Sequence, residues 1–371
     1  MKFAVTVLVF CVAALLSLGM VMLYSSSMTQ VGAHYLIMQL IWCALGLVLC
    51  VGATASDYRW LKKIAWPLLG VAIILLALVM VPHFGRRING ARRWFSLGPA
   101  NLQPSEMAKI ALIIALAWYG EHFQRKMPTL KRGIVTPGFF IAPVLGLIFI
   151  EPDRGSTILL ACVCGAMLLV SGVRFNFILP PVVLGAAALA YSLWHDPMRR
   201  ERILAFLHPE KYKNGVGYQS WQAMIALGSG GWTGLGLGNG RQKLGFVPEH
   251  HTDFILSIIG EELGLVATLL VVLTFIIFCI CGLYIASKAR DTFGMLLATG
   301  LTVLIGLQAA INIGVVTSAL PNKGLPLPFI SYGGSNLLAM LTCVGLLLSV
   351  ARHSRVEEDM ADEPVGEAQT A

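Results

Sequence analysis

The segment Lys243–Leu265, KLGFVPEHHTDFILSIIGEELGL, places Asp253, Glu261 and Glu262 in an apolar run that continues to Ala286. An apolar run of this length predicts a membrane-spanning helix. An ionisable side chain at membrane depth costs roughly 2.5–3.5 kcal/mol on insertion scales, so these carboxylates are candidates for a functional site. If the run is helical throughout, Asp253 and Glu261 lie about 12 Å apart along the axis. That separation assigns one carboxylate to the chemistry and the other to a supporting position.

The composition excludes a soluble enzyme, because 57% of the 371 residues are hydrophobic and only 12% are charged. We expect an all-α polytopic membrane protein with about ten transmembrane helices and a large outer loop between spans 7 and 8. One membrane domain would cover residues 1–352, with outer loops at 83–104, 196–252 and 316–331. The expected spans are 3–24, 34–55, 64–82, 105–123, 134–150, 155–173, 175–195, 253–286, 293–315 and 332–351.

The distribution of basic residues predicts the orientation. Short loops on one side carry Lys62, Lys63, Arg125 and Lys288, so the positive-inside rule places that side, and both termini, in the cytoplasm. The C-terminal segment 353–371 is acidic and poor in apolar residues, and we expect a disordered cytoplasmic tail. All eight cysteines lie in apolar segments without zinc-site spacing and indicate neither a metal nor a compartment.

Two outer loops carry more positive charge than this rule allows. Loop 83–104 holds Arg92, Arg93 and Trp94, and loop 196–252 includes Lys243. An anionic partner at the outer surface would favour such charge, either lipid headgroups or a substrate phosphate held by arginine. Trp94 beside two arginines suits a phosphate next to a sugar face, or the membrane interface.

The remaining outer segments predict a cavity. The stretch 228–240 is rich in glycine, and 321–337 combines prolines and glycines with Lys323. Non-helical backbone at membrane depth is tolerated only where protein buries it or where it lines a cavity. The three outer loops therefore predict an outward-facing cavity with cations, a carboxylate base and amphipathic aromatics.

Lys109 lies one turn into a span and is expected to pair with Glu106 or Ser105.

We expect a metal ion only where the protein and the substrate bind it together. His250 and His251 flank Asp253, but adjacent residues in an extended loop point apart, which disfavours a transition-metal site. Mg²⁺ or Mn²⁺ favours carboxylate plus phosphate, so we expect such an ion between Asp253 and a substrate pyrophosphate.

Four motifs resemble those of the SEDS family, the FtsW/RodA type of bacterial cell-wall polymerase. They are RRWFSLG with QPSEMAK (92–98, 103–109), GYQSWQAMIALGSGGWTGLGLG (217–238), LGFVPEHHTDFILSIIGEELGL (244–265) and LPLPFISYGGSN (325–336). The resemblance implies a ten-span inverting glycosyltransferase that polymerises lipid II. It also implies a class B penicillin-binding protein as partner, together with other divisome proteins, membrane lipids and no nucleic acid.

By motif, the family's essential aspartate falls on Asp253 and its second acidic position on Glu261. The motif Trp falls on Trp94, and the family's basic loop residues fall on Arg92, Arg93 and Lys109. We expect further substrate contacts at Lys243, Lys323 and Ser335. Lys323-Gly324 is more similar to division-type members, which implies the division site of the bacterial cytoplasmic membrane. The family's Gln-Pro-Asp-(Leu/Phe)-Gly-Thr reads Glu151-Pro152-Asp153-Arg154-Gly155-Ser156 here, which leaves the role of Asp153 open.

The mechanism that this resemblance implies uses Asp253 as general base on the acceptor 4-hydroxyl. Arg92, Arg93, Lys323 and a divalent cation would stabilise the departing pyrophosphate, and an opening between spans would admit the lipid laterally. Three alternatives remain: a lipid II flippase, a scaffold for the transpeptidase, and an elongation-type polymerase.

Overall fold

A computed structural model describes residues 1–27, 32–82, 84–88, 91–97, 100–247 and 251–361. Ten long helices dominate the described chain: α1 (Lys2–Ser27), α2 (His34–Ala55), α3 (Leu61–Met80), α4 (Pro104–His122), α5 (Thr136–Ile150), α6 (Arg154–Val170), α7 (Phe175–Trp194), α10 (Ile255–Ser287), α11 (Thr292–Val316) and α12 (Gly334–Ala361). Each covers one expected span, so the predicted fold class is confirmed. In the described residues, eight helices are long and apolar enough to cross a membrane by themselves, and α6 is a shorter apolar helix.

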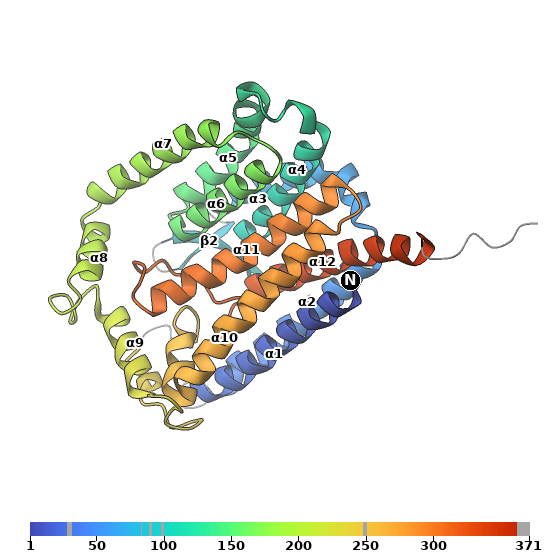
Figure 1. Cartoon of the computed structure of the whole chain (residues 1–371). Coiled ribbons are helices and arrows are strands. Elements are labelled where there is room, and N and C mark those ends of the chain that lie inside the picture. The colour runs from blue at the N-terminus through green and yellow to red at the C-terminus, as the bar shows by residue number, and fades with distance from the viewer. Residues whose placement is uncertain (28–31, 83, 89–90, 98–99, 248–250, 362–371) are drawn as a thin grey trace, which may run out of the picture.

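The centre of the bundle is formed by α11 and α12. Within their spanning parts 67% and 78% of the residues are buried, against 6% in α7. α11 packs on α4, α6 and α10, while α12 packs mainly on α2. Figure 1 shows α10 crossing the bundle beside α11 and α1. Polar residues inside α11 therefore face protein and not lipid.

Helix α7 stands apart from this bundle. Ile178 is its only buried residue within the described chain. Figure 1 shows α7 extending away from the other spans and returning through α8 (Pro197–Leu207) and α9 (Tyr218–Ser229). Because the helix is apolar all round, lipid can cover the faces that protein does not.

The outer loop 83–104 contains a small sheet that we did not predict. Strands β1 (Gly85–Ile88), β2 (Ala91–Leu97) and β3 (Ala100–Leu102) form an antiparallel sheet in the order β1-β2-β3. Arg86 pairs with Trp94, and Arg87 with Arg92. The available signal was Asn89-Gly90 between two short runs, a hairpin dipeptide that itself lies outside the described residues.

The C-terminal boundary also differs from the expectation. α12 continues to Ala361, so the backbone of 353–361 is helical and the segment is not disordered from 353 onward. Residues 362–371, the rest of the predicted tail, lie outside the described chain.

A charged cluster ties three helices together at the end of the bundle where α1 begins and α12 ends. The Lys62 ammonium donates to Asp291 Oδ2 (2.7 Å) and to Glu121 Oε1 (2.8 Å). The Tyr58 hydroxyl donates to Asp291 Oδ1 (2.6 Å), which also caps α11 through the Gly294 N–H. Burial alone would raise the pKa of Asp291, but the hydrogen bonds from Lys62 and Tyr58 outweigh it and lower that pKa.

Substituting Lys62→Gln should lower the stability of the bundle. Two carboxylates would lose a charged donor, and a hydrogen bond to a charged group contributes about 1.5–3 kcal/mol. Lys63→Gln is the matched control, because this neighbouring lysine is exposed and surface substitutions change stability by roughly 0.5 kcal/mol or less. Thermal unfolding in detergent would measure both, and equal melting temperatures for the two variants would contradict the expected effect.

Candidate active site

Asp253 lies in a turn just before α10, which begins at Ile255, so it is not on the helix that carries Glu261. Its backbone carbonyl accepts a hydrogen bond from Asn312 Nδ2 of α11 (2.8 Å). The same amide nitrogen donates to the Leu325 carbonyl (2.7 Å). The buried Asn312 side chain therefore fixes the position of Asp253 relative to the 321–333 loop.

The segment Lys323–Leu325 contacts both Asp253 and the start of α6. A Cβ at Gly324, where φ is +60°, would lie 3.2 Å from Asp253 Oδ2. A Cβ at Gly155 would lie 2.8 Å from the Lys323 carbonyl oxygen. The structure thus brings together Asp253, Lys323 and the 151–156 motif, three segments that are distant in sequence.

Asp153 caps α6 within this cluster. Its carboxylate accepts from the Ser156 N–H and hydroxyl (both 3.0 Å) and from Gln103 Nε2 (3.4 Å). The Gln103 N–H in turn donates to Ser335 Oγ (3.0 Å), which donates to the Asn101 carbonyl (2.9 Å). Asp153 and Ser335 are both buried. The two residues therefore join the starts of α6, α4 and α12, and Ser335 does not offer its hydroxyl to a substrate here.

The small sheet presents its predicted site residues on two faces. Alternate residues of a strand point to opposite sides, so Arg92 and Trp94 share one face of β2 and Arg93 lies on the other. The Arg93 guanidinium donates to the carbonyls of Glu151 (2.8 Å) and Pro152 (2.7 Å). Arg93 therefore anchors the sheet to the α5–α6 turn, while Arg92 and Trp94 stay on the opposite face.

Glu151 is the least satisfied carboxyl group of the described chain. It is 2% exposed, and neither of its oxygens has a hydrogen-bond partner among the described residues. Burial raises its pKa to about 8, the charge of Asp153 adds to the increase, and Arg93 opposes it. The side chain is therefore largely neutral at pH 7, like the glutamine of the motif that it resembles.

Glu261 holds the glycine-rich loop in place. Its carboxylate accepts from the backbone N–H groups of Arg241 (2.8 Å) and Gln242 (3.2 Å). It does not pair with Lys109, whose ammonium binds Glu106 instead. Glu261 is buried and acts on the loop backbone.

Glu262, the third carboxylate of the apolar run, forms a buried ion pair. It accepts from Lys243 Nζ (2.7 Å), Ser25 Oγ (2.7 Å) and the Gly238 N–H (3.1 Å). Lys243 also donates to Ser25 Oγ (3.0 Å) and the Gly238 carbonyl (2.8 Å), and it is 2% exposed. In this structure the Lys243 ammonium therefore lies inside the protein, and its expected substrate contact stays a prediction.

The glycine-rich loop also pairs with the backbone of α10. Leu235 N–H donates to the Glu261 carbonyl and Gly236 N–H to the Glu262 carbonyl (both 3.0 Å). A Cβ at Gly234, where φ is +80°, would overlap the Glu262 carbonyl. The helix is itself interrupted at Gly264 (φ 78°). Glycines are thus required here for close backbone approach.

Lys109 belongs to a polar network inside the bundle. As predicted, it pairs with Glu106 (2.8 Å), and it also reaches Gln308 Oε1 (3.4 Å). Glu106 accepts from Asn336 Nδ2 (3.2 Å), and Gln308 Nε2 donates to the Pro326 carbonyl (3.0 Å). All four side chains are buried. Lys109 therefore supports the 321–333 loop through Gln308, and its side chain has no exposed surface for substrate.

We did not predict the amide side chains Gln103, Gln308, Asn312 and Asn336. The available signal was a polar residue inside or at the edge of an apolar span, which in membrane helices marks interhelical hydrogen bonding.

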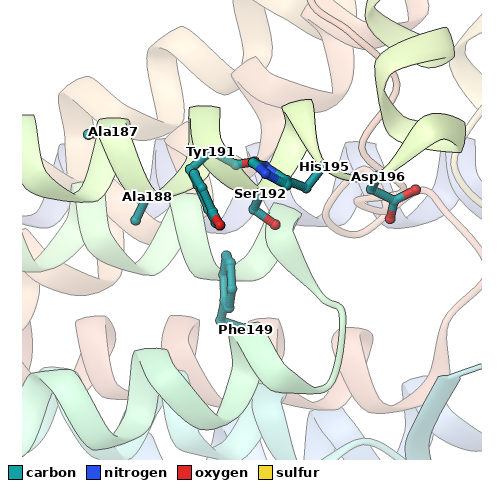
Figure 2. A pocket seen from close by; sticks show the side chains of 7 residues that line it. All are labelled: Phe149, Ala187, Ala188, Tyr191, Ser192, His195 and Asp196. Carbon is teal, nitrogen blue, oxygen red and sulfur yellow. The ribbon is translucent and has the colours of Figure 1, made fainter.

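An open cavity lies between the outer part of α7 and α5. It has a volume of about 720 Å³. Figure 2 shows Phe149 pointing across it toward Tyr191 of α7. Its lining residues are Phe149, Ala187, Ala188, Tyr191, Ser192, His195 and Asp196. The lining is mostly apolar.

Asp253 is the residue that would hold the expected shared cation, and its carboxylate is a donor that suits Mg²⁺ or Mn²⁺. Within the described ranges there is no group of three or more His, Cys, Asp or Glu side chains that could bind a metal ion; His250 lies outside those ranges. Mg²⁺ commonly uses one or two carboxylates together with substrate phosphate oxygens, and Asp253 can supply the protein's share.

Comparison with known proteins identifies the family. The model of the FtsW/RodA/SpoVE family, described as "Cell cycle protein", matches residues 6–356. The chain belongs to this family. It is 43% identical over 354 residues to the "Probable peptidoglycan glycosyltransferase FtsW" of Trichlorobacter lovleyi, covering 93% of this chain and 92% of that protein. The FtsW relative from Pseudomonas fluorescens is 40% identical, with 95% and 91% covered.

Solved structures of the family share the fold. One, described as "Structural coordination of polymerization and crosslinking by a peptidoglycan synthase complex", superposes with a TM-score of 0.80 at 32% identity, covering 94% of this chain and 97% of that one. Rod shape determining protein RodA of Thermus thermophilus gives a TM-score of 0.71 at 31% identity, with 94% and 96% covered. The predicted family and the class of peptidoglycan glycosyltransferase, of the FtsW type, are confirmed.

Glu151 should make the stability of the protein depend on pH. The pKa is raised from 4.5 to about 8, so the folded state keeps a proton that the unfolded chain releases. Stability should therefore be greatest below pH 4.5 and fall toward pH 8, by at most about 1.4 kcal/mol per pH unit. Glu151→Gln should flatten this dependence.

Unfolding midpoints measured between pH 4.5 and 8 would test this expectation. The exposed Glu201→Gln variant is the control and should keep the slope of the wild type. An unchanged slope in Glu151→Gln would show that this carboxyl is not the titrating group.

Proposed function

We propose that this chain polymerises lipid II into glycan strands at the outer face of the bacterial cytoplasmic membrane during cell division. The observation that supports the proposal is the placement of Asp253 at the outer end of the bundle, fixed by Asn312 and beside Lys323–Gly324. The FtsW relatives support the reaction and the division role, because they are 37–43% identical over most of the chain.

In the proposed reaction Asp253 removes the proton from the acceptor sugar's 4-hydroxyl. The resulting oxygen nucleophile attacks the anomeric carbon of the donor from the face opposite the lipid pyrophosphate, so the configuration inverts. The bond from that carbon to the pyrophosphate oxygen breaks, and its electron pair leaves with undecaprenyl pyrophosphate. A positioned general base contributes about 10²–10⁴-fold to such a step.

Cations near the outer surface would stabilise the leaving group. Lys323 precedes Gly324, the residue that adjoins Asp253 Oδ2, and Arg92 lies on the face of β2 away from the Arg93 anchor. Mg²⁺ or Mn²⁺ bound by Asp253 and the pyrophosphate would neutralise further charge. Arg93 acts indirectly in this proposal, because its guanidinium binds the carbonyls of the α5–α6 turn.

The lipid chain of the substrate would enter beside α7. This helix leaves the bundle along most of its length, and the cavity that it shares with Phe149 is open and largely apolar. The glycan would then remain at the outer loops while the hydrocarbon stays in the membrane.

We further propose a class B penicillin-binding protein as partner, with other divisome proteins joining the pair. A solved family member is described as part of a complex that coordinates polymerization with crosslinking. The lipid-facing side of α10, which includes Leu269, Leu273, Ile276 and Ile280, is apolar and exposed, and it could accept a partner's membrane helix. Both termini would lie in the cytoplasm, as the basic loops indicate.

The test is glycan-strand formation from purified lipid II with Mg²⁺ or Mn²⁺ and the co-purified transpeptidase. Asp253→Asn should lower the rate by about 10²-fold or more while leaving the melting temperature and partner binding unchanged. Glu201→Gln, an exposed outer-loop carboxylate, is the control and should polymerise like the wild type.

Two results would contradict the proposal. If Asp253→Asn polymerised at the wild-type rate, Asp253 would not be the base. If the wild type made no polymer but moved lipid II across vesicle bilayers, the chain would be a flippase. A protein inactive in both assays that still bound the transpeptidase would fit the scaffold alternative.

A further inference from the structure

A group of basic residues lies far from the candidate active site, in the segment between α4 and α5. Arg125, Lys126, Lys131 and Arg132 fall within eight positions, and no acidic residue occurs from 122 to 150. The first three are exposed, and no ion pair joins them to a carboxylate within the described part of the chain. Arg132 lies over the Phe123 ring, 4.4 Å from its centroid.

A second chain segment adds another cation to this group. The Tyr119 hydroxyl donates to the Arg132 carbonyl (2.7 Å), which fixes the segment on α4. A Cβ at Gly133 would lie 3.2 Å from a methyl group of Val173, so the α6–α7 turn packs against it. Arg174 follows in that turn and is exposed. The basic group is therefore built from two loops that the fold holds together.

The general preference for positive loops on this side does not explain the lack of carboxylates. On the same side Lys62 is neutralised by both Glu121 and Asp291. Asp57 Oδ1 lies 3.8 Å from His353 Nε2. Carboxylates are thus available at neighbouring positions, and the segment between α4 and α5 has none.

An apolar groove begins directly beside these cations. A cavity of about 400 Å³ lies on the first turns of α5. A Cβ at Gly138 would meet no atom within 4 Å, and Phe139 is 78% exposed. The lining residues are Val135, Gly138, Phe139, Ala142 and Pro143. Because α5 spans the membrane, the groove runs from the basic segment into the hydrocarbon layer.

We propose that this surface is a binding site for an anionic phospholipid. The lipid phosphate would lie among Arg125, Lys126 and Lys131, and one acyl chain would lie along Gly138 and Ala142. Basic pockets between helix ends attract anionic headgroups, at about 1 kcal/mol for each cation near the surface. The site lies at the opposite end of the helices from Asp253 and does not depend on the proposed reaction.

The test is native mass spectrometry of the full chain with phosphatidylglycerol or phosphatidylcholine. Lys126→Gln/Lys131→Gln should reduce retention of phosphatidylglycerol by about tenfold or more. The control is Lys63→Gln/Lys288→Gln, which removes the same charge from two exposed lysines on the same side and should retain the lipid. Gly138→Leu fills the groove without changing charge and should also reduce retention.

Three outcomes would overturn the site. Equal losses in both double variants would mean diffuse attraction to the surface. Equal retention of phosphatidylcholine and phosphatidylglycerol by the wild type would mean that charge is not recognised. Unchanged retention by Gly138→Leu would mean that the groove is not occupied. Because binding is the readout, glycan synthesis does not enter the result.

Discussion

Irregular backbone beside a membrane must satisfy its N–H and C=O groups within the protein, and this requirement determines the structure of the bundle end that holds Asp253. Asn312 uses one amide nitrogen to bind the carbonyls of Asp253 and Leu325. Gln308 does the same for Pro326 from the next turn of α11. The site therefore depends on two polar side chains of the central helix α11. Their hydrogen bonds are strong because water and lipid are excluded from that part of the bundle.

Three buried carboxylates at this end of the bundle bind groups of the protein itself. Glu261 accepts from two loop N–H groups, Glu262 pairs with Lys243, and Asp153 caps α6. Breaking a buried pair leaves an uncompensated charge, which typically costs 3–5 kcal/mol. These residues can therefore be essential to activity without contacting substrate. Asp253 is held through its backbone carbonyl, and its Oδ2 adjoins Gly324.

The ten helices could be predicted from the sequence because each is a long apolar run, and the family could be predicted from four motifs. The sequence also led us to expect that the loop containing Lys323 and the segment of Asp253 converge, and Gly324 of that loop adjoins Asp253 Oδ2. Partners of buried ions could not be predicted: Lys243 looked like an outer-loop cation, and only the fold shows that Glu262 and Ser25 surround it. The sheet at 85–102 was missed because its strands are too short for a clear alternating pattern.

The most direct test of this account is hydrogen–deuterium exchange of the Asn312→Ala variant. We predict that amides in 251–254 and in 321–327 lose protection from exchange together, while the protection of amides in the C-terminal half of α10 does not change. Asn336→Ala, which removes a buried amide that binds Glu106, should leave 251–254 protected. If Asn312→Ala left both segments as protected as in the wild type, the α11 amide would not be what holds Asp253 in place.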